Sequence, residues 1–206
     1  SYDAIEVFGS GTNGTQVRGN LIGLGPWSAA AIPNGRYGIR ITQDAQGTVV
    51  GGQTDYRNII SGNGESGVYL SDVTATEVSH NYIGTGVDGD DDMGNGWHGV
   101  AIEGTSTTNF VNNNVIAGNN RHGVWLSGSG VTGNYVTGNV VGTDAAASTA
   151  IANGWHGVAL KQEQLEKALA ELGPVDKSAR GQVAKPEDLK PAEVKPPAAR
   201  PPAAQA

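Results

Sequence analysis

A short phrase of alternating apolar and variable positions returns along the first 160 residues. It consists of Gly, then Val or Ile, then a variable residue, then Leu or Ile, so its apolar positions lie two apart. The copies lie at 38–41, 67–70, 99–102, 123–126 and 157–160, with a degenerate copy at 4–7. A period of two is that of a β-strand, and irregular spacing between copies is typical of one structural unit repeated with loops of different length.

Each repeat carries two further strand patterns. The second is a polar residue, a variable residue and Val, at 15–17, 48–50, 76–78, 109–111 and 134–136. The third is Asn, a variable residue and Ile or Val, at 20–22, 58–60, 81–83, 114–116 and 139–141. Three short strands per repeat predict a triangular coil whose strands pair in parallel with their equivalents in the next coil. The expected fold class is therefore all-β, with about five coils of three strands each.

One Asn opens the third pattern in every repeat. Such a column predicts a ladder, because an Asn side chain at a buried corner can bond the Asn above and below it. Its members are Asn20, Asn58, Asn81, Asn114 and Asn139. Gly at the coil corners permits left-handed backbone conformations, in keeping with 32 Gly in the chain. We interpret the Asn column as structural and not as ligand-binding.

The composition changes near residue 160. Residues 1–160 contain no Lys and are acidic, whereas seven of the nine Pro lie in residues 161–206. The segment 161–173 has an apolar stripe of helical period that ends at Gly-Pro, so we expect a helix that caps the last coil. Residues 174–206 are rich in Pro, Ala and Lys, which is typical of an extended or disordered tail, with a fusion or linker as the alternative.

The composition also excludes some classes of function. The chain has no Cys, which excludes disulfides and thiol redox chemistry. No stretch approaches the roughly 20 apolar residues of a membrane-spanning helix, so no membrane insertion is expected. An acidic, Lys-free solenoid lacks the clustered cations that phosphates require, so nucleic acid is not an expected partner.

The beginning of the chain carries a separate expectation. It starts at Ser1 without Met or a signal peptide, which we interpret as a mature or excised chain. The strand edge at residues 2–7 offers backbone groups to another strand. We therefore predict that further coils or another subunit cover this edge.

Two runs resemble a known group of proteins. They read Val-Val-Gly-Gly-Gln-Thr-Asp-Tyr-Arg-Asn-Ile-Ile-Ser-Gly-Asn at 49–63 and Gly-Asn-Val-Val-Gly-Thr-Asp at 138–144. The runs resemble bacterial right-handed parallel β-helix repeat proteins, the pectate-lyase-like solenoids of secreted and surface proteins. The resemblance covers residues 1–160, and it implies a right-handed, single-stranded parallel β-helix in an extracellular or cell-surface protein.

The resemblance leaves several functions open, because the group includes lyases, hydrolases and adhesin-like stalks. Lyases of the group imply a calcium cluster of carboxylates with basic residues, and the solenoid has no Lys. Hydrolases of the group imply paired Asp beside a Gly-His-Gly segment, and no paired Asp accompanies 97–99, 121–123 or 155–157. No catalytic residue is therefore carried over. We predict a rigid structural or adhesive module with polysaccharide as its candidate ligand, and the alternative is a polysaccharide-active lyase or hydrolase, or a fragment of one.

Alignment of the repeats places candidate ligand-binding residues in columns about 4.8 Å apart. Trp97, Arg121 and Trp155 share a column, which predicts a guanidinium between two indoles, and flat aromatic faces are surfaces against which sugar rings pack. The full set is Trp97, Arg121, Trp155, Trp125, Tyr69, His98, His122 and His156. The alternative is that these side chains only stack on one another. The three His form a straight ladder, which spreads ligands along a line and favours a pH-sensitive structural column over a metal site.

One acidic loop is the metal candidate. Asp88, Asp90 and Asp92 have the spacing that begins a calcium-binding loop, but Met93 stands where that loop requires Gly. Calcium is therefore the one cofactor considered, and a solvated acidic loop is the favoured interpretation. No other cofactor is expected.

Overall fold

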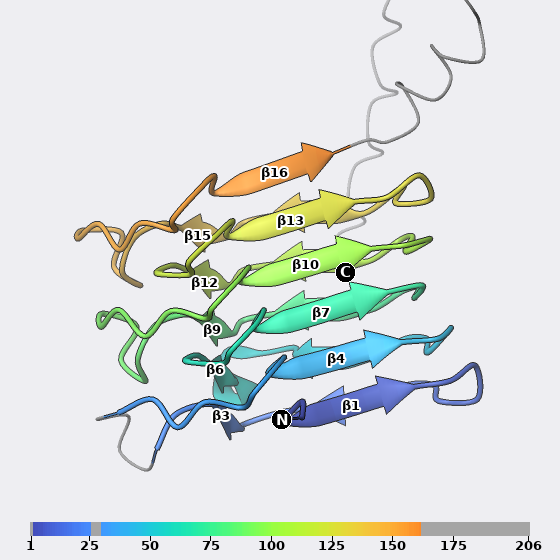
Figure 1. Cartoon of the computed structure of the whole chain (residues 1–206), viewed down its shortest axis with the longest axis horizontal. Helices are drawn as coiled ribbons and strands as arrows, with labels where there is room; N and C mark the ends of the chain where they lie inside the picture. The colour runs from blue at the N-terminus through green and yellow to red at the C-terminus, as the bar shows by residue number, and fades with distance from the viewer. Residues whose placement is uncertain (1, 26–29, 162–206) are drawn as a thin grey trace, which may run out of the picture. The chain divides into compact units, whose positions relative to one another are not determined.

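The computed structural model describes residues 2–25 and 30–161, which form five stacked coils and one further strand (Figure 1). The first sheet has six strands: β1 (Ile5–Phe8), β4 (Ile39–Thr42), β7 (Val68–Ser71), β10 (Val100–Glu103), β13 (Val124–Ser127) and β16 (Val158–Lys161). The second has five: β2 (Gln16–Val17), β5 (Val49–Gly51), β8 (Glu77–Ser79), β11 (Phe110–Asn112) and β14 (Tyr135–Thr137). The third has five: β3 (Leu21–Ile22), β6 (Ile59–Ile60), β9 (Tyr82–Ile83), β12 (Val115–Ile116) and β15 (Val140–Val141).

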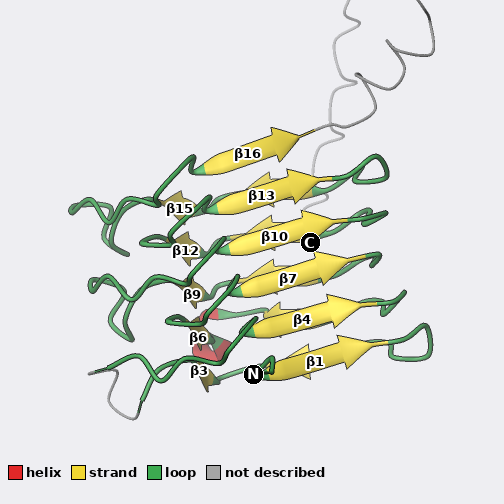
Figure 2. Cartoon of the chain, viewed as in Figure 1, coloured by secondary structure: helices red, strands yellow, loops and turns green. Residues whose placement is uncertain are grey.

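All pairings between these strands are parallel, and each strand pairs with its equivalent in the next coil. This confirms the all-β fold of about five coils with three strands each. One 3-10 turn, η2 (Thr54–Tyr56), occupies the insertion between β5 and β6 (Figure 2). Within the two described ranges, no helix has the length and apolar character needed to cross a membrane.

The apolar positions of the three patterns line the interior. Side chains of the first sheet such as Ile41, Leu70 and Ile102 are completely buried, and their neighbours along the strand face outward or are polar. The second and third sheets contribute one inward column each. The column of the second sheet is Val17, Val50, Val78, Val111 and Val136. The column of the third sheet is Ile22, Ile60, Ile83, Ile116 and Val141. Stacking like residues in register lets each coil bury its apolar face against the coils above and below.

The Gly that opens the first-sheet phrase is required by close packing. A Cβ at Gly99 would lie 2.5 Å from Ile116 Cγ2 and 2.7 Å from the Gly123 carbonyl oxygen, so no larger residue fits. The left-handed conformation expected at corners belongs to other Gly. Gly84 is one of them, with a φ of 92°.

The predicted Asn ladder is confirmed. Each side-chain Nδ2 donates to the Oδ1 of the Asn in the next coil, over 2.9 Å from Asn20 to Asn58, 2.9 Å from Asn58 to Asn81, 3.1 Å from Asn81 to Asn114, and 3.0 Å from Asn114 to Asn139. The same Oδ1 atoms accept backbone N–H groups of the preceding coil. The column therefore satisfies buried backbone groups, as a structural ladder must.

A second Asn ladder was not predicted. It runs through Asn34, Asn63, Asn95, Asn119 and Asn153, with Nδ2 to Oδ1 distances of 2.8, 2.8, 2.9 and 3.0 Å. Each member stands four residues before the Gly of a first-sheet phrase. This constant interval was the signal that could have identified the ladder.

Three expectations are not tested by the structure: the capping helix, the tail and the cover of the β1 edge. Lys161 is the last residue of β16, and the rest of the predicted capping helix at 161–173 and the predicted tail at 174–206 lie outside the described residues. The cover predicted for the β1 edge stays a prediction.

Candidate functional site

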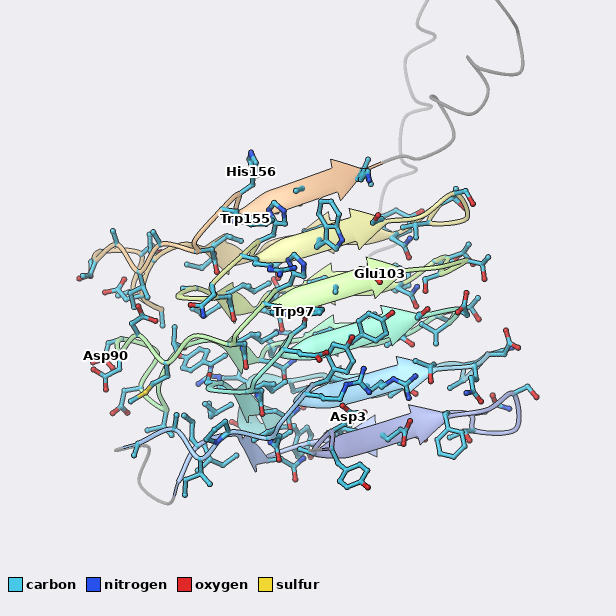
Figure 3. All side chains as sticks on the ribbon, viewed as in Figure 1. Asp3, Asp90, Trp97, Glu103, Trp155 and His156 are labelled. Atoms are coloured by element: carbon cyan, nitrogen blue, oxygen red, sulfur yellow. The ribbon has the colours of Figure 1, made fainter. Side chains whose placement is uncertain are left out.

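The candidate site lies on the outward side of the first sheet, beside the strands β10, β13 and β16. The backbone holds Trp97, Arg121 and Trp155 one above the other, because Arg121 N donates to Trp97 O over 2.8 Å and Trp155 N donates to Arg121 O over 2.9 Å. Figure 3 shows both indoles beside the amino-terminal ends of these strands. The predicted column is thus formed by chain segments that are far apart in the sequence.

Arg121 lies between the two indoles. Its Cζ is 4.6 Å from the ring centroid of Trp97 and 5.4 Å from that of Trp155. Both distances are in the range of cation–π attraction. Trp97 is 37% exposed and Trp155 is 61% exposed, so both indoles keep surface that solvent or a ligand can reach.

The three His form a second column beside the first. The rings of His98 and His122 are 5.2 Å apart and parallel within 2°, and those of His122 and His156 are also 5.2 Å apart. Trp125 stacks beside them, with its ring 4.8 Å from His122 and 5.7 Å from His98. Trp155 meets His122 edge to face at 5.1 Å. These seven side chains are called the aromatic cluster: Trp97, His98, Arg121, His122, Trp125, Trp155 and His156.

Backbone hydrogen bonds determine which ring nitrogen carries the proton in neutral His98 and His122. The N–H of His122 donates to His98 Nδ1 over 3.3 Å, and the N–H of His156 donates to His122 Nδ1 over 3.2 Å. A nitrogen that accepts a hydrogen bond carries no proton, so in the neutral rings the proton resides on Nε2. Both side chains therefore fit the column as neutral imidazoles.

Burial reinforces the neutral form. His98 is only 6% exposed, and burial, followed by the positive charges of His122 and Arg121, lowers the pKa of His98 from 6.5 to about 4. Burial and the charge of His156 also lower the pKa of His122. The cluster thus favours unprotonated imidazoles beside a permanent Arg cation.

We expect this column to make folding stability depend on pH. Between about pH 6.5 and pH 4 the unfolded chain binds a proton at His98 that the folded protein does not. The contribution of His98 to the free energy of unfolding is therefore complete above pH 6.5 and is lost as the pH falls toward 4. Thermal melts from pH 7.5 to pH 4 should show a falling Tm, and His98→Asn, whose Oδ1 can replace Nδ1 as acceptor, should flatten the decline. An equal slope in the variant would contradict the assignment to His98.

Tyr69 belongs to a neighbouring arrangement. Its ring stacks on Tyr37 at 4.4 Å, and its hydroxyl donates to Glu103 Oε2 over 3.1 Å. Burial and the nearby carboxylate of Glu103 raise the pKa of Tyr69, so the phenol remains a donor. The structure thus places Tyr69 on the same sheet face as the cluster but in a pair of its own.

A polar hollow at the carboxyl ends of β10 and β13 was not predicted. It has a volume of about 370 Å³, and its lining residues are Glu103, Gly104, Thr105, Ser127, Gly128 and Ser129. Glu103 and Ser127 are paired in register and follow Ala101 and Trp125 by two residues. The hollow therefore lies beyond Trp125, toward the carboxyl ends of β10 and β13.

The acidic loop does not form a cluster of ligands. Asp88, Asp90 and Asp92 are all exposed, and Asp92 Oδ1 accepts the N–H of Gly94 over 3.3 Å. Among all residues that the structure describes, no group of three or more His, Cys, Asp or Glu is placed to hold a metal ion. The geometry gives no support to calcium at these three Asp.

The comparisons with known proteins agree with this fold. The family model described as periplasmic copper-binding protein (NosD) matches residues 6–165, a span that includes all three sheets. No curated protein and no solved structure gives a significant match. The family is one of right-handed parallel β-helices, in accord with the resemblance stated above. Because the match covers most of the chain, this chain belongs to the NosD family of periplasmic β-helix proteins.

Proposed function

We propose that this chain is a rigid β-helix module of the cell envelope that binds glycans on the aromatic cluster. The observation that carries the proposal is the pair of exposed indoles, Trp97 and Trp155, held two strands apart by Arg121. The family description supports an exported location, because it places its members in the periplasm.

The cluster has the physical properties of a preorganised binding surface. Trp side chains supply large, rigid contact area with few rotatable bonds, so little conformational entropy is lost when a ligand packs on them. Arg121 packs on both indoles, and the ring of His122 also meets Trp155, which further restricts their motion. Two strand spacings separate Trp97 from Trp155 by about 9.6 Å, which allows one extended ligand to contact both.

The scaffold beneath the cluster is suited to the same role. Two continuous Asn ladders and a buried apolar core link every coil to the next. Side chains on such a sheet keep fixed mutual positions, which is what a site for a repeating polymer requires.

In the part of the chain that the structure describes, the His of the aromatic cluster do not fit copper, the metal that the family description names. The Nδ1 atoms of His98 and His122 already accept backbone N–H groups, and the nearly parallel rings of these two His point their Nε2 atoms the same way and not toward a common point. The soft ligands that favour Cu(I) are scarce, since the chain has no Cys and one Met. We therefore assign no metal to the aromatic cluster.

Replacing both exposed indoles tests the proposal. Trp97→Ala with Trp155→Ala should abolish retention of the protein in affinity electrophoresis through glycan-containing gels, because the contact surface is lost. The far-UV circular dichroism should remain that of the parent, since both side chains lie outside the core. Release of soluble fragments from the glycan would instead favour the polysaccharide-active alternative.

A matched control exists on another sheet. Phe110 and Tyr135 also form a stacked pair, with ring centroids 5.1 Å apart, and Tyr135 is 53% exposed. Phe110→Ala with Tyr135→Ala removes comparable aromatic surface and should leave retention unchanged. Equal loss in the two double variants, or no retention of the parent on any glycan, would assign the aromatic cluster to surface stacking alone.

A further inference from the structure

Arg121 differs from Arg36, which occupies the same column. Arg36 Nε lies 3.5 Å from Glu65 Oε1, so its charge is paired. The guanidinium of Arg121 makes two ring contacts, and within the described part of the chain it has no ion pair and no side-chain hydrogen bond. Its donors are therefore available to a ligand.

Within residues 2–25 and 30–161, no carboxylate forms an ion pair with Arg121 to compensate its charge. Its contacts are Trp97 and Trp155, and the imidazoles nearest to it are His98 and His122, whose pKa values its charge helps to lower. The carboxylate of the same column, that of Glu65, lies two coils away from Arg121 and is already paired with Arg36. The cluster is thus a locally cationic spot on a chain whose net charge is −7.

The sandwich also restricts where a partner of Arg121 can approach. The indoles lie against Arg121 from the preceding and the following coil, so its N–H groups are left to donate outward between the two rings. A guanidinium edge presents parallel donors that match the two oxygens of a carboxylate. A ligand that engages this edge would place its adjoining ring beside the exposed parts of Trp97 and Trp155.

We propose that Arg121 binds the carboxylate of an acidic sugar, a uronic acid within the glycan that packs on the two indoles. The inference rests on the proposed function and names its ligand class. Recognition is direct, since the described residues place no carboxylate cluster here that could hold a bridging cation. One Arg on an acidic chain suits a polymer in which acidic and neutral sugars alternate, because a dense polyanion is repelled by the protein's net charge.

Binding to a matched pair of polymers tests this subsite. The probes are hyaluronan, in which glucuronate alternates with a neutral sugar, and the same polymer with its carboxylates reduced to alcohols. Arg121→Gln should weaken binding of hyaluronan about tenfold or more, the size expected for a lost charged hydrogen-bond pair, and change binding of the reduced polymer less than twofold. Arg121→Lys should recover only part of the loss, because Lys keeps the charge without the planar pair of donors.

The controls separate this inference from the proposed function. Arg36→Gln removes the same charge from the same column and should leave hyaluronan binding unchanged, as should EDTA. Equal losses by Arg121→Gln on both polymers would show that Arg121 only holds the indoles, and parent binding to the reduced polymer alone would preserve glycan binding but overturn the subsite. Dextran sulfate distinguishes a carboxylate from any anion, and preferential binding of it would also overturn the proposal. If the parent binds neither neutral nor acidic glycans, the proposed function itself fails.

Discussion

Replacing Ile83 with Asp is expected to abolish cooperative folding of the β-helix. Ile83 is completely buried in the third coil, in register with Ile60 on one side and Ile116 on the other. The substitution removes a core side chain, which costs about 2–5 kcal/mol, and adds the larger cost of a buried carboxylate without a partner. The sum is comparable to the 5–15 kcal/mol that stabilises a typical domain. Circular dichroism at pH 7 should show loss of the β signal and of the thermal transition.

The matched control for this variant is Leu21→Asp. Leu21 lies on β3 of the same sheet, but it faces outward and is 40% exposed. A carboxylate there remains solvated, so the Tm of the Leu21→Asp protein should differ by only a few degrees from that of the parent. A folded Ile83→Asp protein with a sharp transition would contradict the inward orientation of β9. Val124→Asp, at another fully buried position, should behave like Ile83→Asp.

Replacing Asn95 with Asp is expected to destabilise the protein strongly although the two side chains have the same shape. Asn95 Nδ2 donates to Asn119 Oδ1 over 2.9 Å and to Ile60 O over 2.9 Å. A carboxylate cannot donate, so it would face two oxygens inside a completely buried site. Each unsatisfied buried group costs about 1–3 kcal/mol, more when it faces a charge, so the total loss should exceed about 3 kcal/mol. Urea denaturation at pH 7 measures this as a lower midpoint.

The pH dependence of the same variant provides its internal check. A buried carboxylate facing oxygens has a raised pKa, and the protonated acid regains one donor, so the loss in Asn95→Asp should shrink as the pH falls below that pKa. Asn120→Asp serves as the control, because Asn120 is exposed in the same corner of the next coil. Equal midpoints for the two variants at pH 7 would contradict a stabilising role for the second Asn ladder.

The sequence predicted the fold well because the coil is encoded locally. Each strand has its own period-two phrase, and the Asn of the third pattern marks the register of every coil, so three sheets follow from alignment alone. The second Asn ladder was not predicted because its members lie in loops of variable length that precede the first-sheet phrase. Asn95 and Asn119, for example, are followed by Gly96 and Asn120, so only the interval of four residues to the Gly that opens the first-sheet phrase is constant.

The candidate site was only partly predictable, because alignment places residues in columns but does not orient side chains between columns. The Trp97–Arg121–Trp155 stack lies within one column and was expected. The stacking of Trp125 on His98 and His122 crosses columns and depends on the rotamer of the indole. The hollow beside Glu103 depends on loop conformation after β10 and β13, which no repeat pattern specifies.

Both Asn ladders have a direction. Along each ladder, every Nδ2 except the last donates to the Asn Oδ1 of the coil that follows in the sequence, and every Oδ1 except the first accepts from the coil that precedes it. The side-chain amides therefore form two columns of aligned dipoles whose positive ends point the same way along the stack, the counterpart in side chains of the macrodipole of an α-helix. A negative charge is best tolerated at the end toward which the donors point, where Asn153 accepts two N–H groups from Asn119. Addition of a further coil is consequently polar, since one end of each column must receive a donor and the other an acceptor.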